Sequence, residues 1–168
     1  MITVGILSDT HLQAVNESFV RQCAAAFAGC DMIIHAGDLI DIAVLKVFKG
    51  KDIHAVCGNM CNKTTREILP EEKHIVLGGY SIAITHGAGP KYNIEERVFE
   101  KFPDADCIVF GHTHTSVCRK IGRTLLINPG SFMGTGQYGA AGTYALLTIA
   151  KNGSTELSAS IHTLPDHI

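Results

Sequence analysis

Five short apolar segments, each followed directly by a polar cluster, constrain the fold of this 168-residue chain more than any other feature. Their hydrophobicity is continuous rather than alternating, which is typical of strands that are buried on both faces. Because the carboxyl ends of the strands in an open α/β sheet line one crevice, we expect the five polar clusters to lie close together there. The segments are residues 2–7, 32–35, 53–57, 81–85 and 107–110.

Helical patterns between these segments indicate three helices. Their apolar residues recur at helical spacing, and a polar side chain that could cap the helix precedes each of them. Asn93 and Glu96 have the spacing of a capping box. The predicted helices and their caps are 19–27 with Asn16, 42–48 with Asp41, and 94–101 with Asn93.

The C-terminal third changes character, because antiparallel hairpins replace the alternation of strands and helices. Residues 121–124 and 151–154 each carry a two-residue hairpin signal, and the Asn-Gly pair of the second is the stronger. Glycine-rich residues 134–142 lie between them and are interpreted as a connection between hairpins in preference to a phosphate-cradling loop. Together these patterns predict an α/β sandwich built on mixed sheets, in a single domain over residues 1–168.

Composition and charge exclude several classes of protein. Apolar residues make up 46% of the chain and charged residues 18%, a balance typical of a globular protein rather than a disordered one. The formal net charge of −2 argues against long nucleic acid or an anionic membrane as a partner. We see no signal-peptide pattern and no apolar run of the ~18 residues that a membrane span needs, so we expect a cytoplasmic protein without membrane contact.

Cysteines and isolated histidines have ordinary structural interpretations. The chain has six cysteines without a CxxC pair, so no disulfide framework is expected. Cys57 and Cys61 are interpreted as small half-buried thiols, in preference to half of a zinc site or a reactive Cys61. Five histidines are interpreted as core or surface residues, although His35 could lie next to the metal ligands and help to orient them. These five are His35, His54, His74, His162 and His167.

The polar clusters would bring two carboxylates, four imidazoles and one amide oxygen into the predicted crevice. A set of nitrogen and oxygen donors without thiolate suits Mn, Fe, Zn, Co or Ni rather than a soft metal or a purely Mg site. Seven ligands are too many for one ordinary transition-metal ion, and they suit two ions that share a bridging carboxylate and a bridging water. The candidate ligands are Asp9, His11, Asp38, Asn59, His86, His112 and His114.

The order of these motifs, D-x-H, G-D, G-N, H-G and G-H-x-H, resembles that of the calcineurin-like metallophosphoesterases. Residues 111–114 and 128–131 also look like the compact YfcE-type phosphodiesterases of bacteria and archaea. The resemblance extends from Ile2 to about Leu147. It implies a four-layer-type α/β sandwich of two mixed β-sheets flanked by helices, which agrees with the pattern of strands and helices.

The resemblance also implies a hydrolase with two divalent metal ions, of which Mn is favoured and Ni, Zn, Fe and Co are alternatives. Asp9, His11 and His114 match the ligands of the first ion, and Asp38 matches the ligand that bridges the two ions. The positions that match the ligands of the second ion are Asn59, His86 and His112.

A metal-dependent phosphoesterase of this kind uses a bridging hydroxide as its nucleophile, since two metal ions lower the pKa of the bound water. The resemblance to small diesterases favours a small phosphodiester over a monoester as the substrate. Asn59 and His112 are candidates for contacts to the phosphate. Compact relatives are often dimers, so a homodimer is left open.

Two departures from the family pattern concern proton transfer and substrate. Many relatives follow the Gly-Asn pair with a histidine or an Asp-containing turn, whereas this chain continues Met60-Cys61-Asn62, so the general acid is unassigned. Small relatives often carry an arginine soon after Asn-Pro-Gly-Ser. Here residues 132–136 read Phe-Met-Gly-Thr-Gly, and we expect a substrate contact to differ.

Two other functions were weighed against the enzyme. The retromer-associated scaffold protein resembles this fold but recruits partners through its surface, with an incomplete set of ligands. All seven ligand positions are filled here, which favours the enzyme over a non-catalytic interaction module. A dinucleotide-binding Rossmann domain is excluded, because the first strand ends in Ser8-Asp9-Thr10-His11 and not in a glycine-rich phosphate loop.

Overall fold

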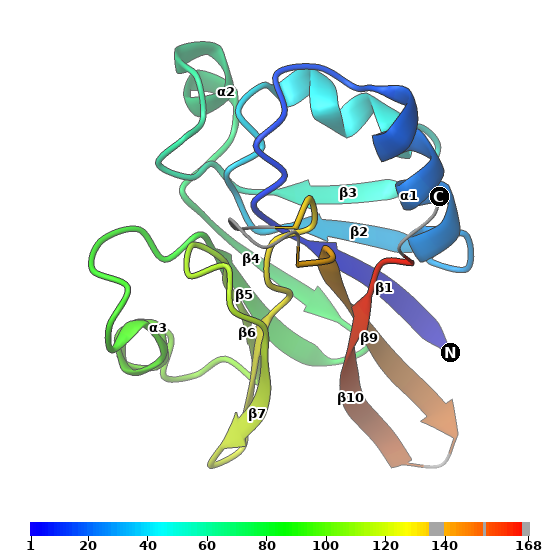
Figure 1. Cartoon of the computed structure of the whole chain (residues 1–168). Helices are drawn as coiled ribbons and strands as arrows, with labels where there is room; N and C mark the ends of the chain where they lie inside the picture. Colours follow the sequence, from blue (N-terminus) through cyan, green and yellow to red (C-terminus); the bar gives the residue numbers. More distant parts are fainter. Residues whose placement is uncertain (135–139, 153, 166–168) are drawn as a thin grey trace.

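The computed structural model describes residues 1–134, 140–152 and 154–165, and within them ten strands form two mixed sheets (Figure 1). The strands of the first sheet, in order across it, are β10 (Ser154–Thr163), β9 (Thr143–Asn152), β1 (Ile2–Leu7), β2 (Met32–His35) and β3 (Asp52–Ala55). Strands β1, β2 and β3 are parallel, and β9 runs antiparallel to both β1 and β10.

The second sheet has the same mixed character. Its strands, in order, are β4 (Glu72–Leu77), β5 (Tyr80–Thr85), β6 (Cys107–Val109), β8 (Thr124–Asn128) and β7 (Val117–Ile121). Strands β5, β6 and β8 are parallel, while β4 and β7 run antiparallel at the two edges.

Helices cover the outer faces of the two sheets. They are α1 (Glu17–Phe27), the 3-10 helix η1 (Ile42–Phe48), α2 (Lys63–Ile68) and α3 (Ile94–Lys101). None of the described helices is long and apolar enough to cross a membrane.

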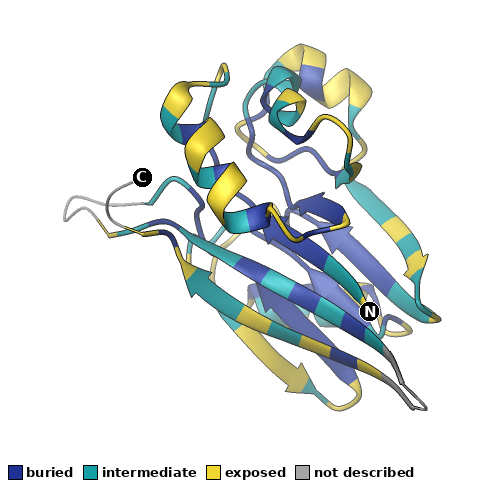
Figure 2. Ribbon diagram, turned by 90° about the vertical axis from the view of Figure 1, so that its right-hand side faces the viewer, coloured by how far each residue is buried: buried dark blue, intermediate teal, exposed yellow. Residues whose placement is uncertain are grey.

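Three apolar clusters hold the layers together. The largest lies between the sheets and joins Val4 and Ile6 of β1 to Ile84 of β5 and Ile127 of β8. A second cluster packs α1 and η1 onto the first sheet, and a third packs α3 onto the second sheet. Figure 2 shows that the strands carry most of the buried positions while the outward faces of the helices are exposed. This arrangement confirms the predicted sandwich of two mixed sheets flanked by helices.

Strand β1 shows why its hydrophobicity is continuous. Val4 and Ile6 face the core between the sheets, whereas Leu7 packs into the cluster under α1. Gly5 also faces that helix, and a Cβ atom at this position would lie 2.4 Å from Cδ1 of Phe27. Both faces of the strand are therefore covered, and α1 approaches closely because residue 5 has no side chain.

The predicted strands and hairpins agree with the structure except at some ends. Residues 56 and 57 lie beyond β3, because the Cys57 amide bonds to the Pro70 carbonyl instead of continuing the ladder. Residues 121–124 form the predicted hairpin, in which Ile121 pairs with Thr124. Strands β9 and β10 pair as expected, but Gly153 of their turn and residues 135–139 of the glycine-rich loop lie outside the described residues.

Two predicted helix caps are confirmed and one is wrong. Asn16 Oδ1 accepts from the Phe19 amide at 2.8 Å, and Asp41 Oδ1 accepts from the Ala43 amide at 2.8 Å. Asn93 has φ 55°, in the left-handed region, and makes no side-chain cap bond. A capping side chain needs an extended backbone to reach the first amides of the helix, so the predicted capping box does not form.

Two elements carried too little apolar pattern to be predicted. Helix α2 has six residues, of which only Thr65 is buried, so no amphipathic stripe marks it. Asn62 caps it by accepting from the Thr65 amide at 2.8 Å. Strand β4 is an edge strand in which exposed His74 and Val76 interrupt partly buried neighbours.

Replacing Asn16 by alanine should lower the free energy of unfolding by about 1 kcal/mol, because the Phe19 amide loses the side-chain acceptor at the start of α1. Urea denaturation would measure the change. Asn16→Asp keeps an oxygen in the capping position and should stay within about 0.5 kcal/mol of the wild type. Equal losses in the two variants would show that the cap is not the cause.

Candidate metal centre

The seven candidate ligands follow strands of both sheets. Asp9 and His11 follow β1, Asp38 follows β2 and Asn59 follows β3, all in the first sheet. The remaining three, which follow β5 and β6 of the second sheet, are His86, His112 and His114. The crevice therefore lies between the carboxyl ends of two packed sheets rather than along one.

Backbone hydrogen bonds join the loops that carry these residues. The Asp9 amide donates to the Gly37 carbonyl at 3.0 Å, and the His11 amide donates to the Asp38 carbonyl at 3.0 Å. The Gly111 amide donates to the His86 carbonyl at 3.2 Å. Neighbouring loops thus fix one another, which holds the polar side chains in place.

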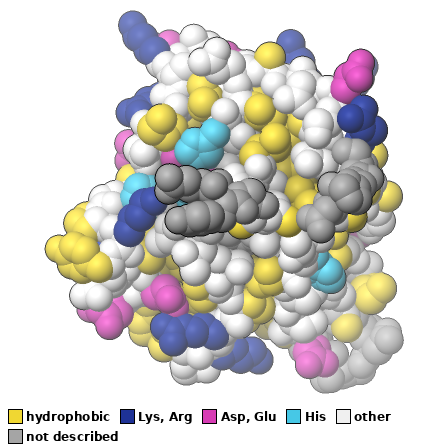
Figure 3. Space-filling view, in the orientation of Figure 1, with side chains coloured by type: hydrophobic (Ala, Val, Ile, Leu, Met, Phe, Trp, Pro, Cys, Tyr) yellow, Lys and Arg dark blue, Asp and Glu magenta, His cyan; other side chains and the backbone are white. Residues whose placement is uncertain are grey.

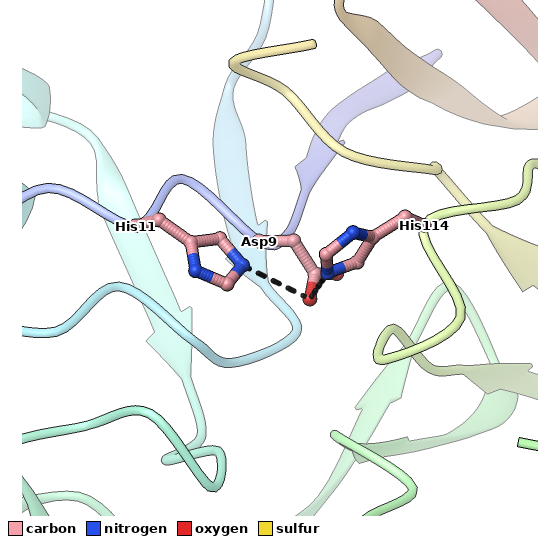
Figure 4. Close-up of side chains that lie close together, drawn as sticks. All are labelled: Asp9, His11 and His114. Carbon is pink, nitrogen blue, oxygen red and sulfur yellow. Dashed lines mark ion pairs between the residues drawn. The ribbon is translucent and has the colours of Figure 1, made fainter. Parts of the chain in front are cut away.

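Asp9, His11 and His114 form the first cluster, in which one donor atom from each lies within 4.8 Å of the others. Nε2 of His114 is 3.1 Å from Oδ1 of Asp9, and Nε2 of His11 is 3.7 Å from the same oxygen. Figure 4 shows both rings directed at that oxygen. The carboxylate is buried while the two histidines are partly exposed, so the cluster opens to solvent on the histidine side. Histidine side chains are visible at the surface of the molecule in the orientation of Figure 1 (Figure 3).

Asp38, His86 and His112 form the second cluster, with the same mutual spacing of one donor atom from each residue. Nε2 of His86 lies 3.1 Å from Oδ2 of Asp38, and both side chains are buried. The rings of His86 and His112 meet edge to face, with their centroids 5.2 Å apart.

Backbone carbonyls decide which ring nitrogen faces the second cluster. Nδ1 of His86 lies 2.8 Å from the Ala36 carbonyl, and Nε2 of His112 lies 2.7 Å from the Gly89 carbonyl. A carbonyl only accepts, so these nitrogens carry the protons and donate. When the rings are neutral, the opposite nitrogens, Nε2 of His86 and Nδ1 of His112, have a free lone pair, which is the state that a metal ligand requires.

Three buried atoms in the two clusters have no hydrogen-bond partner. They are Asp9 Oδ1, His11 Nε2 and His86 Nε2. Burial of a polar atom without a partner costs roughly 1–3 kcal/mol, so native proteins rarely leave several such atoms side by side. Carboxylate oxygen and imidazole nitrogen are donors that divalent transition metals prefer, and these atoms fit such an ion.

The backbone at the clusters is held in an uncommon conformation. Outside glycine, a positive φ is rare, and each instance costs on the order of 1 kcal/mol or more. Strain of this kind concentrates at functional sites, where the surrounding structure enforces it. Five of the seven candidate ligands show it, namely Asp9 (φ 53°), His11 (φ 50°), Asp38 (φ 56°), His112 (φ 70°) and His114 (φ 62°).

Burial and charge compete at both carboxylates. Burial favours a raised pKa for Asp9, but the adjacent His11 ring, the charges of His86 and His114 and the hydrogen bond from Ser8 hold this pKa below its usual value. Burial likewise opposes ionisation of Asp38, and its contact with His86 together with the Met60 amide keeps the pKa of this carboxyl low. Both carboxylates are therefore ionised at neutral pH.

The pKa values of His86 and His114 shift in opposite directions. Burial would lower the pKa of His86, but the Asp38 carboxylate beside it raises the pKa instead. At His114 burial dominates, and the positive charge of Lys91 adds to it, so the pKa is lowered. His114 is thus neutral and able to act as a ligand.

His35 lies behind the clusters and not in them. Its ring is fully buried, and Nε2 lies 3.2 Å from Oγ1 of Thr10. Burial is the main cause that lowers the pKa of His35 to about 4. The ring is neutral and supports the turn between Asp9 and His11 through Thr10.

Asn59 is less firmly placed than the other candidates. Its side chain is exposed and lines a cavity of about 350 Å³ together with His86. Its neighbours contact Asp38: the Met60 amide donates to Asp38 Oδ1 at 2.7 Å, and a Cβ atom on Gly58 would lie 2.2 Å from that oxygen. A role of Asn59 as a ligand stays a prediction.

The other residues considered in the sequence lie outside the two clusters. Cys57 and Cys61 are buried, and Cys61 Sγ accepts from the Gly58 amide at 3.2 Å, which fits a structural role. His54, His74 and His162 belong to strands and to neither cluster, and His167 lies outside the described residues.

Sequence patterns gave no signal for several residues that support the clusters. The Gly89 carbonyl contacts the His112 ring only because the folded loops bring the two together. Arg66 and Arg97 bond to backbone carbonyls of loops that border the clusters. Ser8 is a partial exception, because it adjoins Asp9; its Oγ donates to Asp9 Oδ2 at 2.6 Å.

Comparisons with known proteins agree with the fold. Residues 2–152 match the family model described as the calcineurin-like phosphoesterase superfamily domain. A probable metallophosphoesterase of Methanocaldococcus jannaschii is 34% identical over 134 residues, which are 76% of this chain and 67% of that protein. A protein of the same organism named as a phosphodiesterase is 28% identical over 149 residues, 78% of this chain and 84% of that one.

Among solved structures, Vps29 of Entamoeba histolytica in complex with Zn²⁺ has a TM-score of 0.74 against the chain. The sequence identity is 20%, and the match covers 99% of this chain and 95% of that one. At this identity the similarity concerns the fold alone.

His35→Gln should flatten the dependence of stability on pH in the metal-free protein. A buried histidine whose pKa falls from 6.5 to about 4 stabilises the fold fully above pH 6.5, and this contribution is lost as the pH falls toward 4. Between pH 7.5 and 5 the wild type should lose about 2 kcal/mol through this group, and the variant should not. Urea denaturation at the two pH values measures the difference.

Thr10→Val is the control, because it removes the hydroxyl partner and leaves the His35 ring buried. Since burial is the main cause of the shift, this variant should keep the wild-type change with pH. An equal change with pH in wild type and His35→Gln would contradict the assignment.

Proposed function

The chain belongs to the calcineurin-like phosphoesterase superfamily, and we propose that it hydrolyses small phosphodiesters with two divalent metal ions. One observation carries the proposal: Asp9 Oδ1, His11 Nε2 and His86 Nε2 are buried without partners in two adjacent groups of metal-binding residues. A buried polar atom without a hydrogen bond lowers the stability of a protein unless a bound ligand such as a metal ion contacts it.

We assign the ligands by cluster. Asp9, His11 and His114 would hold the first ion, and His86 and His112 would hold the second. Asp38 would bridge the two ions, and Asn59 would complete the second set. The free lone pairs that the Ala36 and Gly89 carbonyls leave on His86 and His112 support this assignment.

The donor atoms favour a transition metal of intermediate hardness. Neither cluster contains a thiolate, which argues against a soft metal, and the imidazoles argue against Mg²⁺. We favour Mn²⁺, with Ni²⁺, Zn²⁺, Fe²⁺ and Co²⁺ as alternatives. When bound, the two ions would act as Lewis acids and supply a nucleophile from water near neutral pH.

Asn59 is the better candidate for a contact to the phosphate. The Nε2 proton of His112 is already donated to the Gly89 carbonyl, so this ring has no donor left if Nδ1 binds a metal. The exposed carboxamide of Asn59 has an oxygen for the metal and an NH₂ group for a phosphoryl oxygen.

The residue that follows Asn59 cannot protonate a leaving group. Met60 stands beside Asn59 with 52% of its surface exposed, and a thioether has no proton to donate. We therefore expect substrates with good leaving groups to react fastest. Lys91, which lines a cavity next to Thr113 and lowers the pKa of His114, is a candidate cation for a phosphoryl oxygen.

Two cavities beside the clusters favour a diester over a monoester. One, of about 350 Å³, lies between α2 and α3 and reaches Asn59 and His86. The other, of about 540 Å³, is lined by Lys91, Tyr92 and Thr113; none of the candidate ligands lines it, and Thr113 connects it to His112 and His114 only along the chain. A diester has a substituent for each cavity and a monoester has only one. The relative named as a phosphodiesterase supports the same choice.

The alternative is a non-catalytic interaction module, and the similarity in fold to Vps29 is consistent with it. Metal binding does not separate the two functions, since that Vps29 structure contains Zn²⁺. The presence of a suitable residue at all seven candidate ligand positions favours the enzyme. The single domain over residues 1–168, the cytoplasmic location and the homodimer stay predictions.

Metal-stripped protein should hydrolyse bis(p-nitrophenyl) phosphate only after Mn²⁺ is added, and p-nitrophenyl phosphate more slowly. The release of p-nitrophenolate measures both rates. Preference for the monoester would overturn the assignment of a diesterase. Binding of two ions without turnover of either substrate would favour the interaction module.

Asp38→Asn should lower kcat for the diester at least about 100-fold, because the carboxylate that would neutralise both ions is lost. The matched control is Asp52→Asn, which removes an exposed carboxylate on β3 and should leave the rate unchanged. Near-normal turnover of Asp38→Asn would exclude the bridging role.

A further inference from the structure

Two arginines outside the clusters hold the loops that border the second cluster. On the basis of the two-ion site proposed above, we propose that Arg66 and Arg97 are positioning residues for the second metal ion. Neither side chain belongs to a metal-binding group, and each acts through a backbone segment that contacts the second cluster.

Arg66 of α2 reaches back to the loop that follows β3. Its Nε donates to the Cys61 carbonyl at 2.8 Å, and its Nη2 donates to the Asn59 carbonyl. Met60 lies between these two carbonyls, and its amide donates to Asp38 Oδ1 at 2.7 Å. The guanidinium thus fixes both sides of the residue that holds the Asp38 carboxylate.

Arg97 of α3 repeats this arrangement on the loop that follows β5. Its Nη1 donates to the Ala88 carbonyl at 3.3 Å, and its Nη2 donates to the Pro90 carbonyl. Gly89 lies between them, and its carbonyl accepts the Nε2 proton of His112 at 2.7 Å. Gly89 has φ +112°, and a Cβ atom there would lie 3.2 Å from Arg97 Nη1. Glycine therefore permits both the turn and the close approach of the guanidinium.

The two contacts share one geometry. In each, an arginine from the following helix bonds the carbonyls on either side of a single residue, and that residue contacts the second cluster. A planar guanidinium can donate to two carbonyls at once, whereas the ammonium of lysine is a point donor on a flexible stem. Substitution by lysine should therefore fail to replace either arginine.

The first cluster is supported differently. Within the described residues, Asp9 is held by Ser8 Oγ at 2.6 Å and by the His112 amide at 3.2 Å, and no arginine bonds to its loop. Loss of Arg97 should therefore weaken the second ion selectively. Loss of Arg66, which acts through the bridging Asp38, should weaken the second ion more than the first. A merely structural role would instead lower the stability of the fold and weaken both ions alike.

Titration of metal-stripped protein with Mn²⁺ by calorimetry tests this selectivity. The wild type should bind two ions. Arg97→Gln should weaken the second ion about tenfold and keep the first within about twofold, since residues that support ligands typically change affinity 10–100-fold. Arg66→Gln should weaken the second ion about tenfold and the first to a smaller extent, because Asp38 would bridge both ions. Arg97→Lys should behave like Arg97→Gln. The control, Arg21→Gln, removes an exposed arginine of α1 and should bind both ions as the wild type does.

Unchanged affinity for the second ion in both glutamine variants would overturn the proposal. So would equal weakening of both ions together with a lower Tm. A wild type that binds only one ion would contradict the proposed function, and the role of Arg97 would then be decided without metal.

The role of Arg97 can be tested without metal by measuring which ring nitrogen of His112 carries the proton in the metal-free protein. The ¹⁵N chemical shifts of the ring report this tautomer. In the wild type the proton should lie on Nε2, where the Gly89 carbonyl accepts it. Arg97→Gln should shift the population toward the Nδ1 proton, while Arg66→Gln should not. An unchanged tautomer in Arg97→Gln would refute the positioning role whatever the metal content.

Discussion

Face-to-face packing of the two sheets is the interaction on which the rest of the structure depends. Each metal-binding group takes its carboxylate from the first sheet and at least one histidine from the second: Asp9 meets His114, and Asp38 meets His86. Neither sheet alone carries a complete group. The apolar residues between the sheets, which have no chemistry of their own, therefore assemble the site by bringing two sets of strand ends to one place.

Much of the fold and most of the site follow from the sequence, because they depend on strong local patterns. Strand β1 is predicted to the residue since its apolar run ends at Leu7, and the polar residues after each strand mark the crevice. The prediction of a cap at Asn93 is wrong because backbone conformation, which spacing does not reveal, decides whether a side chain can cap. Helix α2 has no apolar stripe, and Arg66 and Arg97 act on backbone carbonyls, which no side-chain motif encodes.

Strain and missing hydrogen bonds occur in the same few residues. Asp9 and His11 combine a left-handed backbone with a buried atom that has no partner. Both features cost stability in the metal-free chain, and both are tolerated because neighbouring loops exchange backbone hydrogen bonds across the crevice. Ligands bound to these atoms would remove part of that cost, so metal loading should couple to the stability of the loops.

His112 belongs to both groups through different atoms. Its ring lies in the second cluster, while its amide donates to Asp9 Oδ2 of the first at 3.2 Å. Because the amide is present whatever the side chain, substitution of this histidine would remove a candidate ligand from the second cluster and leave the support of Asp9 intact. In evolutionary terms, a single codon change at this position would take a donor atom from one cluster, while the chain keeps the hydrogen bond that orders the carboxylate of the other.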